Sequence, residues 1–460
     1  MNRSESRISV AIACGGTGGH LFPGFVVAET LRARDCNVTL LISPKEVDQK
    51  AIRNVSGLNI VTLPAVGLQS GNRLAFFRGF LRSLQMSRKL FRSGPPQAAL
   101  AMGGFTSAPP ILAAKWAGAR TFLHESNTIA GRANRLLTRF VDEAFTGFEP
   151  KLSGLKTRHV SRTGTPVRSE FLPRDPATCR RALGLDPSRP VMLVMGGSQG
   201  ASGINDLVIS SLPLVAQAAP KLQWFHLTGP NDLEKVRQAY ASAKVPARIE
   251  SFWQEMHVVL GAATVAISRA GASSLAELAA TQVPSILIPY PVAADNHQFL
   301  NAKSFADSGA ANLLEQKTAT PEKLFELVRP LLENAPPRSK MQESLRGWHM
   351  PGAADQIADS MLRAVEVARA LPHQTCDCSS SLDKPSDHDV AQVSKPAVSP
   401  TSKSAVRGDF LRTQTIDSSW ETRDTAGLSR PSGCATPVGA ASLIEPSRAI
   451  SSPQLTQPQA

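Results

Sequence analysis

The sequence has few of the features that would assign a protein class directly. Its six cysteines are scattered through 460 residues without paired C-x-x-C sets, which indicates neither a disulfide framework nor a zinc site. No stretch approaches the roughly 18 uncharged apolar residues of a membrane-spanning helix. The amino terminus has a short apolar run that meets glycines at Gly15, without the long hydrophobic region of a signal peptide. We therefore expect a cytoplasmic protein.

Acidic side chains are scarce in one part of the chain. Residues 70–139 contain 11 Lys or Arg but a single acid, Glu125. The whole chain carries a net charge of +13, and residues 1–165, with 22 basic and 9 acidic side chains, carry the same net charge, whereas residues 166–370 have 20 and 19. Such a basic region can bind nucleic acid, an anionic membrane or a phosphorylated substrate, and the charge alone does not choose among them.

Apolar residues are scarce near the carboxyl end. Residues 371–460 contain 16 Ser and 9 Pro but only 15 Leu, Ile, Val or Phe. This is below the roughly 20% at which burial can offset the entropy of ordering a chain. We expect residues 371–460 to form a disordered tail, in which Cys376 and Cys378 are solvated rather than part of a metal or redox site.

The rest of the chain alternates short β-branched runs with longer segments of helical periodicity. Strands are predicted at 8–13, 38–42, 98–102, 121–123, 191–195, 222–227, 265–267 and 286–288, and helices at 25–34, 107–116, 273–280, 296–306 and 353–369. This order predicts two doubly wound, Rossmann-like α/β domains, 1–165 and 166–352, followed by a helix at 353–370. Such sheets bind ligands beyond the carboxyl ends of their strands, so the cleft between the domains is the expected site.

The first strand runs directly into a glycine loop, Gly15-Gly16-Thr17-Gly18-Gly19-His20, with a helix expected soon after Pro23. Glycine lets backbone amides approach a ligand, and a helix amino terminus carries roughly half a positive charge, so the loop suits a diphosphate. It is not a P-loop, since no Gly-Lys-Ser/Thr follows. A tight turn without a ligand is an equally good interpretation of this loop alone.

The second domain repeats the pattern. Its first strand is followed by a loop from Gly196 to Ala201, and further on Ser268-Arg269-Ala270-Gly271 opens a helix that carries Glu277. An anion-binding helix start with a carboxylate shortly after it suits a nucleotide sugar, since amides can bind the diphosphate and the carboxylate the ribose hydroxyls. Two such loops favour an enzyme that joins two phosphorylated substrates in a cleft.

The segments GGTGGH, HESN, GTPVR, GGSQGA, SRAGASSLAEL and DNHQFLNA resemble, in order and spacing, the MurG family of glycosyltransferases, over roughly residues 8–368. Members add N-acetylglucosamine to undecaprenyl-diphosphate-linked muramyl-pentapeptide (lipid I), giving lipid II for peptidoglycan synthesis. The resemblance implies a GT-B fold with the acceptor on the first domain and UDP-N-acetylglucosamine (UDP-GlcNAc) on the second. It also implies an inverting, metal-independent transfer without a cofactor.

The resemblance also implies site residues. The positions that match donor-contacting residues of the family are Thr17, Gly18, Gly19, Asn127, Arg168, Ser198, Trp253, Ala272, Ser273, Ser274, Leu275, Ala276, Glu277 and Gln298. Among them, Glu277 resembles the ribose carboxylate and Trp253 a position whose backbone contacts uracil. Three positions depart from the family, namely Phe105 for a tyrosine, Ala108 for a glycine and Thr165 for an asparagine. We expect these departures to affect the geometry of acceptor binding and the closure of the cleft, and not the nucleotide site.

An inverting transfer needs a base for the acceptor hydroxyl. His20 is the leading candidate because its ordinary pKa is near 6.5 and it stands at the first loop. It has two alternative roles, positioning the acceptor diphosphate or a purely structural one. Glu125 is the rival base, unless it simply pairs with a nearby arginine. His297, beside Gln298, is expected to line the cleft rather than to catalyse.

The basic segment 73–92 interleaves arginines with Leu74, Phe77, Leu81 and Leu84 at nearly helical spacing. An ordinary amphipathic helix with its apolar side in the core would have this pattern. Since the implied acceptor is membrane-bound, we favour a peripheral docking face for the cytoplasmic leaflet over nucleic acid, for which no recognition motif is present. Two other functions stay open, a related transferase with a soluble acceptor and a non-catalytic UDP-sugar-binding protein.

Overall fold

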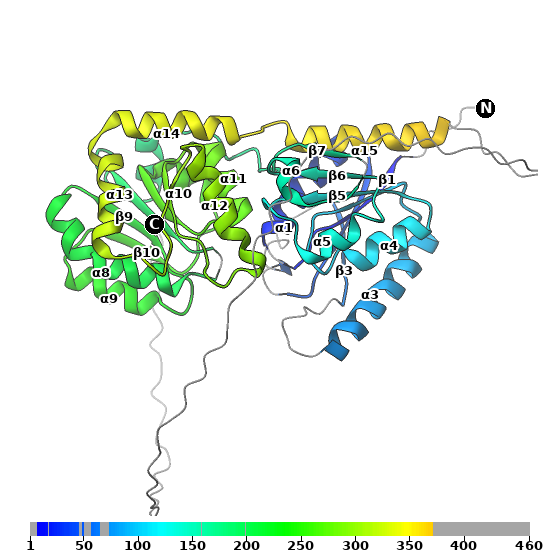
Figure 1. Ribbon diagram of the computed structural model, residues 1–460, viewed down its shortest axis with the longest axis horizontal. Helices are drawn as coiled ribbons and strands as arrows, with labels where there is room; N and C mark the ends of the chain where they lie inside the picture. The colour runs from blue at the N-terminus through cyan, green and yellow to red at the C-terminus, as the bar shows by residue number, and fades with distance from the viewer. Residues whose placement is uncertain are drawn as a thin grey trace, which may run out of the picture. The chain divides into compact units, whose positions relative to one another are not determined.

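The computed structural model describes residues 7–370, except residues 17, 46–47, 50–56, 65–72, 158 and 198. The expected tail at 371–460 lies outside the described residues. Within the described part, the chain forms two parallel-sheet α/β domains, as the alternation of strands and helices predicted (Figure 1).

The sheet of the first domain has seven described strands in the order β3-β2-β1-β4-β5-β6-β7. Every neighbouring pair is parallel, and Val10 of β1 is in register with Val38 on one side and Ala98 on the other. The strands are β1 (Ser9–Ala13), β2 (Asn37–Ile42), β3 (Asn59–Thr62), β4 (Ala98–Ala101), β5 (Arg120–Glu125), β6 (Glu143–Thr146) and β7 (Val160–Arg162).

Successive side chains of a strand point to opposite sides of the sheet. In β1 both sets of side chains are largely apolar and buried, and helices cover both faces of the sheet. Val10 and Ile12 pack into one buried cluster, and Ala11 and Ala13 pack into another on the opposite face. A strand buried on both faces needs a continuous apolar run, which is why these strands could be read from the sequence. The helices between the strands are α1 (Gly18–Ala33), α3 (Arg73–Ser93), α4 (Ala108–Trp116), α5 (Arg132–Leu137) and α6 (Pro150–Ser153).

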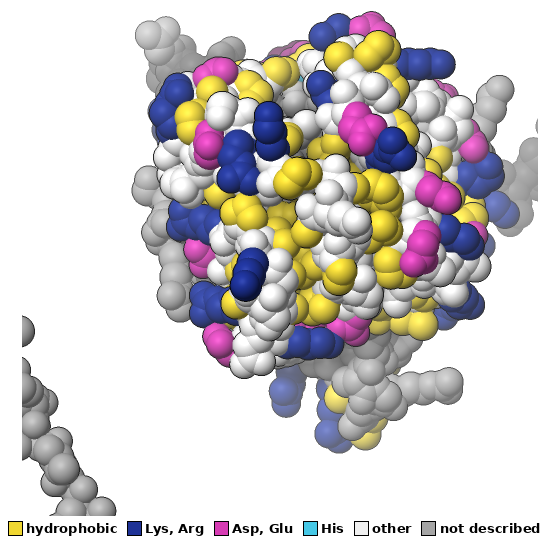
Figure 2. Space-filling view, turned by 90° about the vertical axis from the view of Figure 1, so that its left-hand side faces the viewer, with side chains coloured by type: hydrophobic (Ala, Val, Ile, Leu, Met, Phe, Trp, Pro, Cys, Tyr) yellow, Lys and Arg dark blue, Asp and Glu magenta, His cyan; other side chains and the backbone are white. Residues whose placement is uncertain are grey.

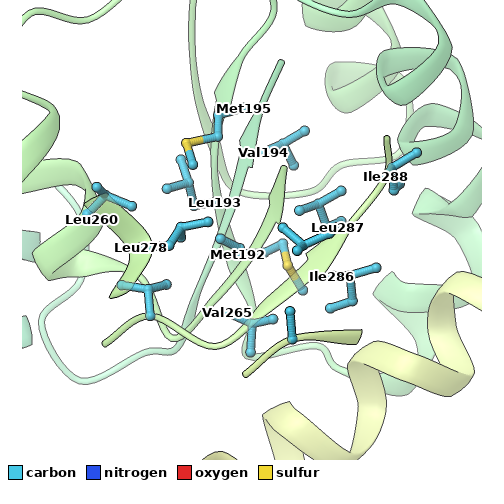
Figure 3. Packing of buried hydrophobic residues seen from close by; sticks show 14 of the residues in the cluster. Met192, Leu193, Val194, Met195, Leu260, Val265, Leu278, Ile286, Leu287 and Ile288 are labelled. Atoms are coloured by element: carbon cyan, nitrogen blue, oxygen red, sulfur yellow. The ribbon is translucent and has the colours of Figure 1, made fainter. Parts of the chain in front are cut away.

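The second domain has a six-stranded sheet in the order β10-β9-β8-β11-β12-β13, again with parallel neighbours. Met192 and Val194 of its central strand β8, with Ile286 and Leu287 of β12, lie in one apolar cluster (Figure 3). The strands are β8 (Val191–Met195), β9 (Gln223–Leu227), β10 (Ala247–Glu250), β11 (Val265–Ser268), β12 (Ser285–Leu287) and β13 (Asn312–Leu313).

The helices of the second domain begin at residues suited to a helix start. Asp175 and Thr320 each accept a hydrogen bond from a backbone amide of the first turn, and a proline follows each of them. The helices are α7 (Pro176–Ala182), α8 (Ser202–Ala218), α9 (Leu233–Ser242), α10 (Met256–Ala262), α11 (Ala272–Thr281), η2 (Ala294–Asn296), α12 (His297–Asp307), α13 (Pro321–Glu333) and α14 (Ala335–Trp348).

The face of this domain in Figure 2 carries acidic and basic side chains interspersed.

The last described helix, α15 (Ala353–Ala370), returns to the first domain. Its residues Ile357, Met361 and Val365 are buried in the same cluster as Val10 and Ile12 of β1. The chain therefore passes between the domains twice, after β7 and after α14. Among the described residues, none of the helices is long and apolar enough to cross a membrane.

Aromatic rings pack beside these crossings. Phe148 of the first domain lies 5.3 Å, centroid to centroid, from Trp348, whose ring stacks on Phe305 of the second domain at 4.4 Å. Gly164 has φ +82°, and a Cβ there would lie 2.7 Å from Cβ of Met350. Glycine at position 164 thus lets the two crossing segments approach closely.

Candidate active site

A cavity of about 590 Å³ lies beyond the carboxyl ends of the strands and is lined from both domains. The first domain contributes residues after β1, β4 and β5, and the second contributes the start of α11 and the segment leading into α12. The lining residues are Gly19, His20, Gly104, Glu125, Ser126, Asn127, Ile129, Ala130, Gly131, Arg132, Ala133, Asn134, Gly271, Ala272, Ser273, Ala294, Asp295, His297 and Gln298. The cavity therefore brings together seven of the predicted site residues, Gly19, His20, Glu125, Asn127, Ala272, Ser273 and Gln298.

The first glycine loop is held close to the second strand. A Cβ on Gly15 would lie 2.3 Å from the backbone nitrogen of Ser43, so only glycine fits there. The Gly16 amide, with φ +112° at that residue, donates to the buried carboxylate of Asp48 at 2.7 Å. The hydrogen bond to Asp48 thus fixes the backbone of the loop. The predicted site residue Thr17 lies outside the described residues.

The helix after this loop begins earlier than the sequence indicated. We expected it to begin soon after Pro23, but α1 begins at Gly18 and contains Pro23. Proline has no amide hydrogen to donate to the carbonyl four residues earlier, which here belongs to Gly19. That carbonyl accepts instead from Oγ of Ser273, in the second domain, at 3.1 Å. The proline that suggested a later start thus leaves a carbonyl available for a contact between the domains.

His20 lies in the first turns of α1 against Gly103 and Gly104. A Cβ on Gly103 would lie 3.0 Å from Nε2 of His20, and one on Gly104 would lie 3.3 Å from Nδ1. Both glycines also have positive φ. The close approach of the ring and the backbone conformation therefore both favour glycine at positions 103 and 104. Burial lowers the pKa of His20 to about 4, against a smaller opposing effect of Asp48. The imidazole is therefore neutral at pH 7, although the same shift makes it a weaker base than an exposed histidine.

Glu125, at the end of β5, is buried and accepts four hydrogen bonds. Its Oε1 accepts from the backbone amide of Asn127 at 2.9 Å and from Nδ2 of the same residue at 3.0 Å. Its Oε2 accepts from the Gly131 amide at 3.1 Å and from Nδ2 of Asn134 at 2.7 Å. Burial raises the pKa of Glu125, while these hydrogen bonds oppose the rise. No arginine is among these partners, and the carboxylate fixes the loop from Ser126 to Gly131.

The start of α11 lines the cavity, and among the described residues no side chain of the capping residue bonds to its first-turn amides. Gly271 is the extended residue before the helix, and Ala272 and Ser273 line the cavity. Ser274 follows in the same turn, whereas Leu275 is buried and, with Ala276, lies beside the crossing segments instead. A helix amino terminus of this kind favours an anionic ligand.

Glu277, in the second turn of α11, lies beside Arg168. The Arg168 guanidinium is stacked between the rings of Phe22 and Phe171, at 4.8 and 4.7 Å, and lies 4.0 Å from Oε1 of Glu277. Burial raises the pKa of Glu277 to about 7, and Arg168 only partly opposes this. The carboxyl group is therefore close to half ionised at neutral pH.

The other described residues of the predicted set are not part of the cavity lining, namely Gly18, Arg168, Trp253, Ser274, Leu275, Ala276 and Glu277. Trp253, after β10, packs edge-on against Phe225 and lies under Arg248 at 4.5 Å. In the second glycine loop, Gly200 has φ +76°, and a Cβ there would lie 2.1 Å from the Thr228 carbonyl oxygen. Ser198 of this loop lies outside the described residues.

The three residues that depart from the family pattern lie in different surroundings, and none of them lines the cavity. Phe105 follows Gly104 of the cavity lining and has the Lys45 ammonium over its ring at 5.6 Å. Ala108 is buried at the start of α4, and Oγ1 of Thr165 would lie 2.5 Å from a Cβ on Gly147.

Among the described residues, no group of three or more His, Cys, Asp or Glu is placed to hold a metal ion.

Asp295, which lines the cavity, and Asn301, which bonds to a loop of the lining, were not predicted. Asp295 pairs with Arg135 of the first domain at 2.6 Å, and Asn301 is a buried residue of α12 that bonds to the Asn127 loop. Both Asp295 and Asn301 stand within the quoted DNHQFLNA segment, and Asn301 follows Gln298 by three positions, on the same side of a helix. This spacing was the available signal, but no periodicity shows what a side chain bonds to across a domain boundary.

Comparison with known proteins gives concordant matches. Residues 10–146 match the glycosyltransferase family 28 N-terminal domain, and residues 191–357 match the family 28 C-terminal domain. The chain is 35% identical over 352 residues to an Anaeromyxobacter sp. protein named UDP-N-acetylglucosamine--N-acetylmuramyl-(pentapeptide) pyrophosphoryl-undecaprenol N-acetylglucosamine transferase, covering 76% of this chain and 91% of the relative. A protein of the same name from Acidithiobacillus ferrooxidans is 36% identical, covering 76% and 96%.

Solved structures agree. Acinetobacter baumannii MurG superimposes with a TM-score of 0.62 at 26% identity, covering 78% of this chain and 99% of that chain. A putative UDP-N-acetylglucosamine 2-epimerase from Listeria monocytogenes reaches a TM-score of 0.59 at 14% identity, covering 80% and 98%. The second match shows a shared fold alone.

Proposed function

The chain belongs to glycosyltransferase family 28, and from this premise we propose that it moves N-acetylglucosamine from UDP-GlcNAc to the C4 hydroxyl of the N-acetylmuramyl residue of lipid I. The product is lipid II, and the anomeric configuration is inverted. The observation that carries the proposal is that one cavity is lined both by His20 and Asn127 of the first domain and by the start of α11 in the second.

The second domain would hold the nucleotide. A carboxylate accepts hydrogen bonds from ribose hydroxyls, and Glu277 lies in the second turn of α11. The amides of Ala272 to Ser274 would bind the diphosphate, assisted by the loop that contains Ser198. The backbone at Trp253 would contact uracil. Arg168, held between two rings, keeps a positive charge beside these groups.

The sugar would lie between the domains. Gln298 lines the cavity, and its Oε1 accepts from the Tyr290 amide at 3.0 Å, which leaves its amino group to donate to a sugar hydroxyl. Asn127 faces the same cavity from the first domain. Gly18 and Gly19, at the start of α1, would contact the donor together with Thr17. Recognition of one sugar by both domains makes a closed cleft a condition of transfer.

The chemistry would rest on His20. Its neutral imidazole takes the proton of the acceptor hydroxyl as the oxygen forms a bond to the anomeric carbon from the face opposite UDP. The bond from that carbon to the diphosphate oxygen breaks, and the departing negative charge is stabilised by the amides at the start of α11. Glu125 is less suited to be the base because both of its oxygens already accept hydrogen bonds from the loop they hold. We therefore assign Glu125 a positioning role.

The acceptor has a lipid tail, and α3 offers a surface for the membrane. The apolar side chains of this helix divide into two sets. Phe80, Leu84 and Leu90 pack on the core, whereas Leu74 and Phe77 are 58% and 57% exposed and Leu81 is 40% exposed. Neighbouring Trp116, 61% exposed, lies against the Arg88 guanidinium at 5.3 Å. An amphipathic helix buried entirely on its apolar side would not have this second, exposed set.

Basic residues surround the exposed set. Arg78, Arg82, Arg88, Lys89 and Arg92 are all exposed on α3. At about 1 kcal/mol per basic residue near an anionic leaflet, they would contribute about 5 kcal/mol, enough for reversible attachment. We infer a peripheral protein on the cytoplasmic face of the cell membrane, which it contacts through residues 73–92. We do not expect these residues to bind nucleic acid.

The test is an incubation of the protein with labelled UDP-GlcNAc and lipid I in the presence of EDTA. Formation of lipid II is the expected result. Tight donor binding without product would overturn the proposal in favour of a UDP-sugar-binding protein. Transfer only to a soluble sugar would overturn it in favour of a related transferase.

A further inference from the structure

Asn301 of α12 is a fully buried side chain whose amide group is saturated by hydrogen bonds. Its Oδ1 accepts from the backbone amide and from Oγ1 of Thr128, both at 2.9 Å. Its Nδ2 donates to the Ala270 carbonyl and to Oδ1 of Asn127, both at 3.1 Å. Thr128 and Asn127 belong to the first domain and Ala270 to the second, so this side chain joins them.

The partners fix which atom of each amide points where. A backbone amide can only donate and a backbone carbonyl can only accept, so Thr128 and Ala270 orient the Asn301 amide without ambiguity. The Asn301 amino group can only donate, so the group that Asn127 turns toward it is its oxygen, and the Asn127 amino group faces Oε1 of Glu125 at 3.0 Å. Both sides of the Asn127 side chain are thus set by other residues.

This arrangement leaves Asn127 with one unshared N–H and one unshared oxygen lone pair. Asn127 lines the cavity, and a sugar hydroxyl can both donate and accept, so it matches this pair. If the Asn127 amide rotated, its donor and acceptor would exchange places. Asn301 is therefore the group that holds the acceptor half of Asn127 in place, while Glu125 holds the donor half.

We propose that Asn301 is a positioning residue that orients Asn127 for the donor sugar and couples sugar recognition to contact between the domains. The proposal rests on the proposed function in that it takes Asn127 as a sugar-binding residue. It adds that the second domain controls how this residue of the first domain is presented.

The test compares binding of UDP-GlcNAc with binding of UDP, which lacks the sugar, by isothermal titration calorimetry. In Asn301→Ala we expect UDP-GlcNAc affinity to fall about tenfold, the effect of one lost polar contact, while UDP affinity changes less than twofold. Asn301→Asp keeps the acceptor for Thr128 but turns an anionic oxygen toward two acceptors. We expect it to lose sugar discrimination as Asn301→Ala does.

A matched control is Gln223→Ala. Gln223 is also a buried carboxamide with three hydrogen bonds, to Asp186 and Arg189, but it opens β9 at the amino end of its strand, away from the site. This variant is expected to lower thermal stability and to leave the ratio of the two affinities unchanged. Equal effects of Asn301→Ala and Gln223→Ala on the ratio would overturn the proposal, because Asn301 would then be purely structural.

A double-mutant cycle gives the second readout. If Asn301 acts through Asn127, the double variant Asn127→Ala/Asn301→Ala should bind UDP-GlcNAc no more weakly than Asn127→Ala alone. Additive losses would contradict the proposal. Because these are binding measurements, a protein that binds UDP-GlcNAc but makes no lipid II would refute the proposed function and still give a result for Asn301.

Discussion

Oγ of Ser273 donates a hydrogen bond to the carbonyl oxygen of Gly19, 3.1 Å away in the other domain. The bond exists because the helical partner of that carbonyl would be residue 23, which is proline and has no amide hydrogen. A residue that is unfavourable inside a helix thus supports contact between the two halves of the cavity.

We predict that Pro23→Ala increases stability and decreases activity. Alanine restores an amide hydrogen that competes with Ser273 for the Gly19 carbonyl, and it removes the cost of proline inside a helix. The melting temperature should rise, and kcat/KM for lipid II formation should fall several-fold. Ser273→Ala is the matched control, and combining the two changes should add little to either loss. A double variant that loses the product of the two single losses would contradict this explanation.

UDP binding should depend on pH through Glu277. The pKa of this carboxyl group is raised to about 7 by burial, so rising pH ionises it and strengthens its hydrogen bonds from ribose hydroxyls. Between pH 6 and pH 8 the ionised fraction, and with it UDP affinity, should increase about tenfold. Glu277→Gln cannot ionise and serves as the control for titration of the diphosphate itself. The same pH dependence in both proteins would show that Glu277 is not responsible.

The fold was largely predictable because buried parallel strands need apolar runs and their ends need loops. The segments from Val10 to Ala13 and from Val191 to Met195 show this directly. The glycine loop after the first strand of each domain could also be identified, and the structure shows that a side chain at Gly15 or Gly200 would collide with a neighbouring backbone. In each case a local pattern is enough to specify the structure.

The contacts between the domains were not predictable. The roles of Asn301 and Asp295 depend on partners 160 or more positions away in sequence, and neither residue type at its position reveals that partner. Pro23 misled for the same reason, because the use of the Gly19 carbonyl is decided by the second domain. Burial shifts the pKa of His20 and of Glu277 in ways that composition does not contain.

The ion pair between Arg135 and Asp295 should help to close the cavity. Asp295 has φ +50°, a conformation that non-glycine residues rarely adopt, and its carboxylate pairs with Arg135 at 2.6 Å and Arg132 at 3.5 Å. Since Arg135 is 48% exposed, the pair should contribute at most about 1 kcal/mol. Asp295→Asn should raise the KM for UDP-GlcNAc a few-fold. The wild-type KM should rise with salt, and the variant KM should not.

Membrane attachment should depend on the exposed side chains of α3. Leu74→Ser/Phe77→Ser should weaken sedimentation with vesicles that contain anionic phospholipid, and added salt should weaken it further. Turnover of a short-chain, water-soluble lipid I analogue should be unchanged, since neither residue lines the cavity. Val367→Ser is the control, because Val367 is 58% exposed on α15, which packs on the opposite face of the sheet. Equal losses of sedimentation in the two proteins would rule out a specific role for α3.

The central claim is that the first domain performs the chemistry and the second holds the donor nucleotide. Its most direct test measures UDP-GlcNAc affinity and lipid II turnover in His20→Ala and Glu277→Ala. His20→Ala should bind the donor nearly as wild type while turnover falls by about 100-fold or more, the usual effect of losing a general base. Glu277→Ala should bind the donor weakly. The reverse pattern, with binding lost in His20→Ala and retained in Glu277→Ala, would contradict the assignment of these two residues.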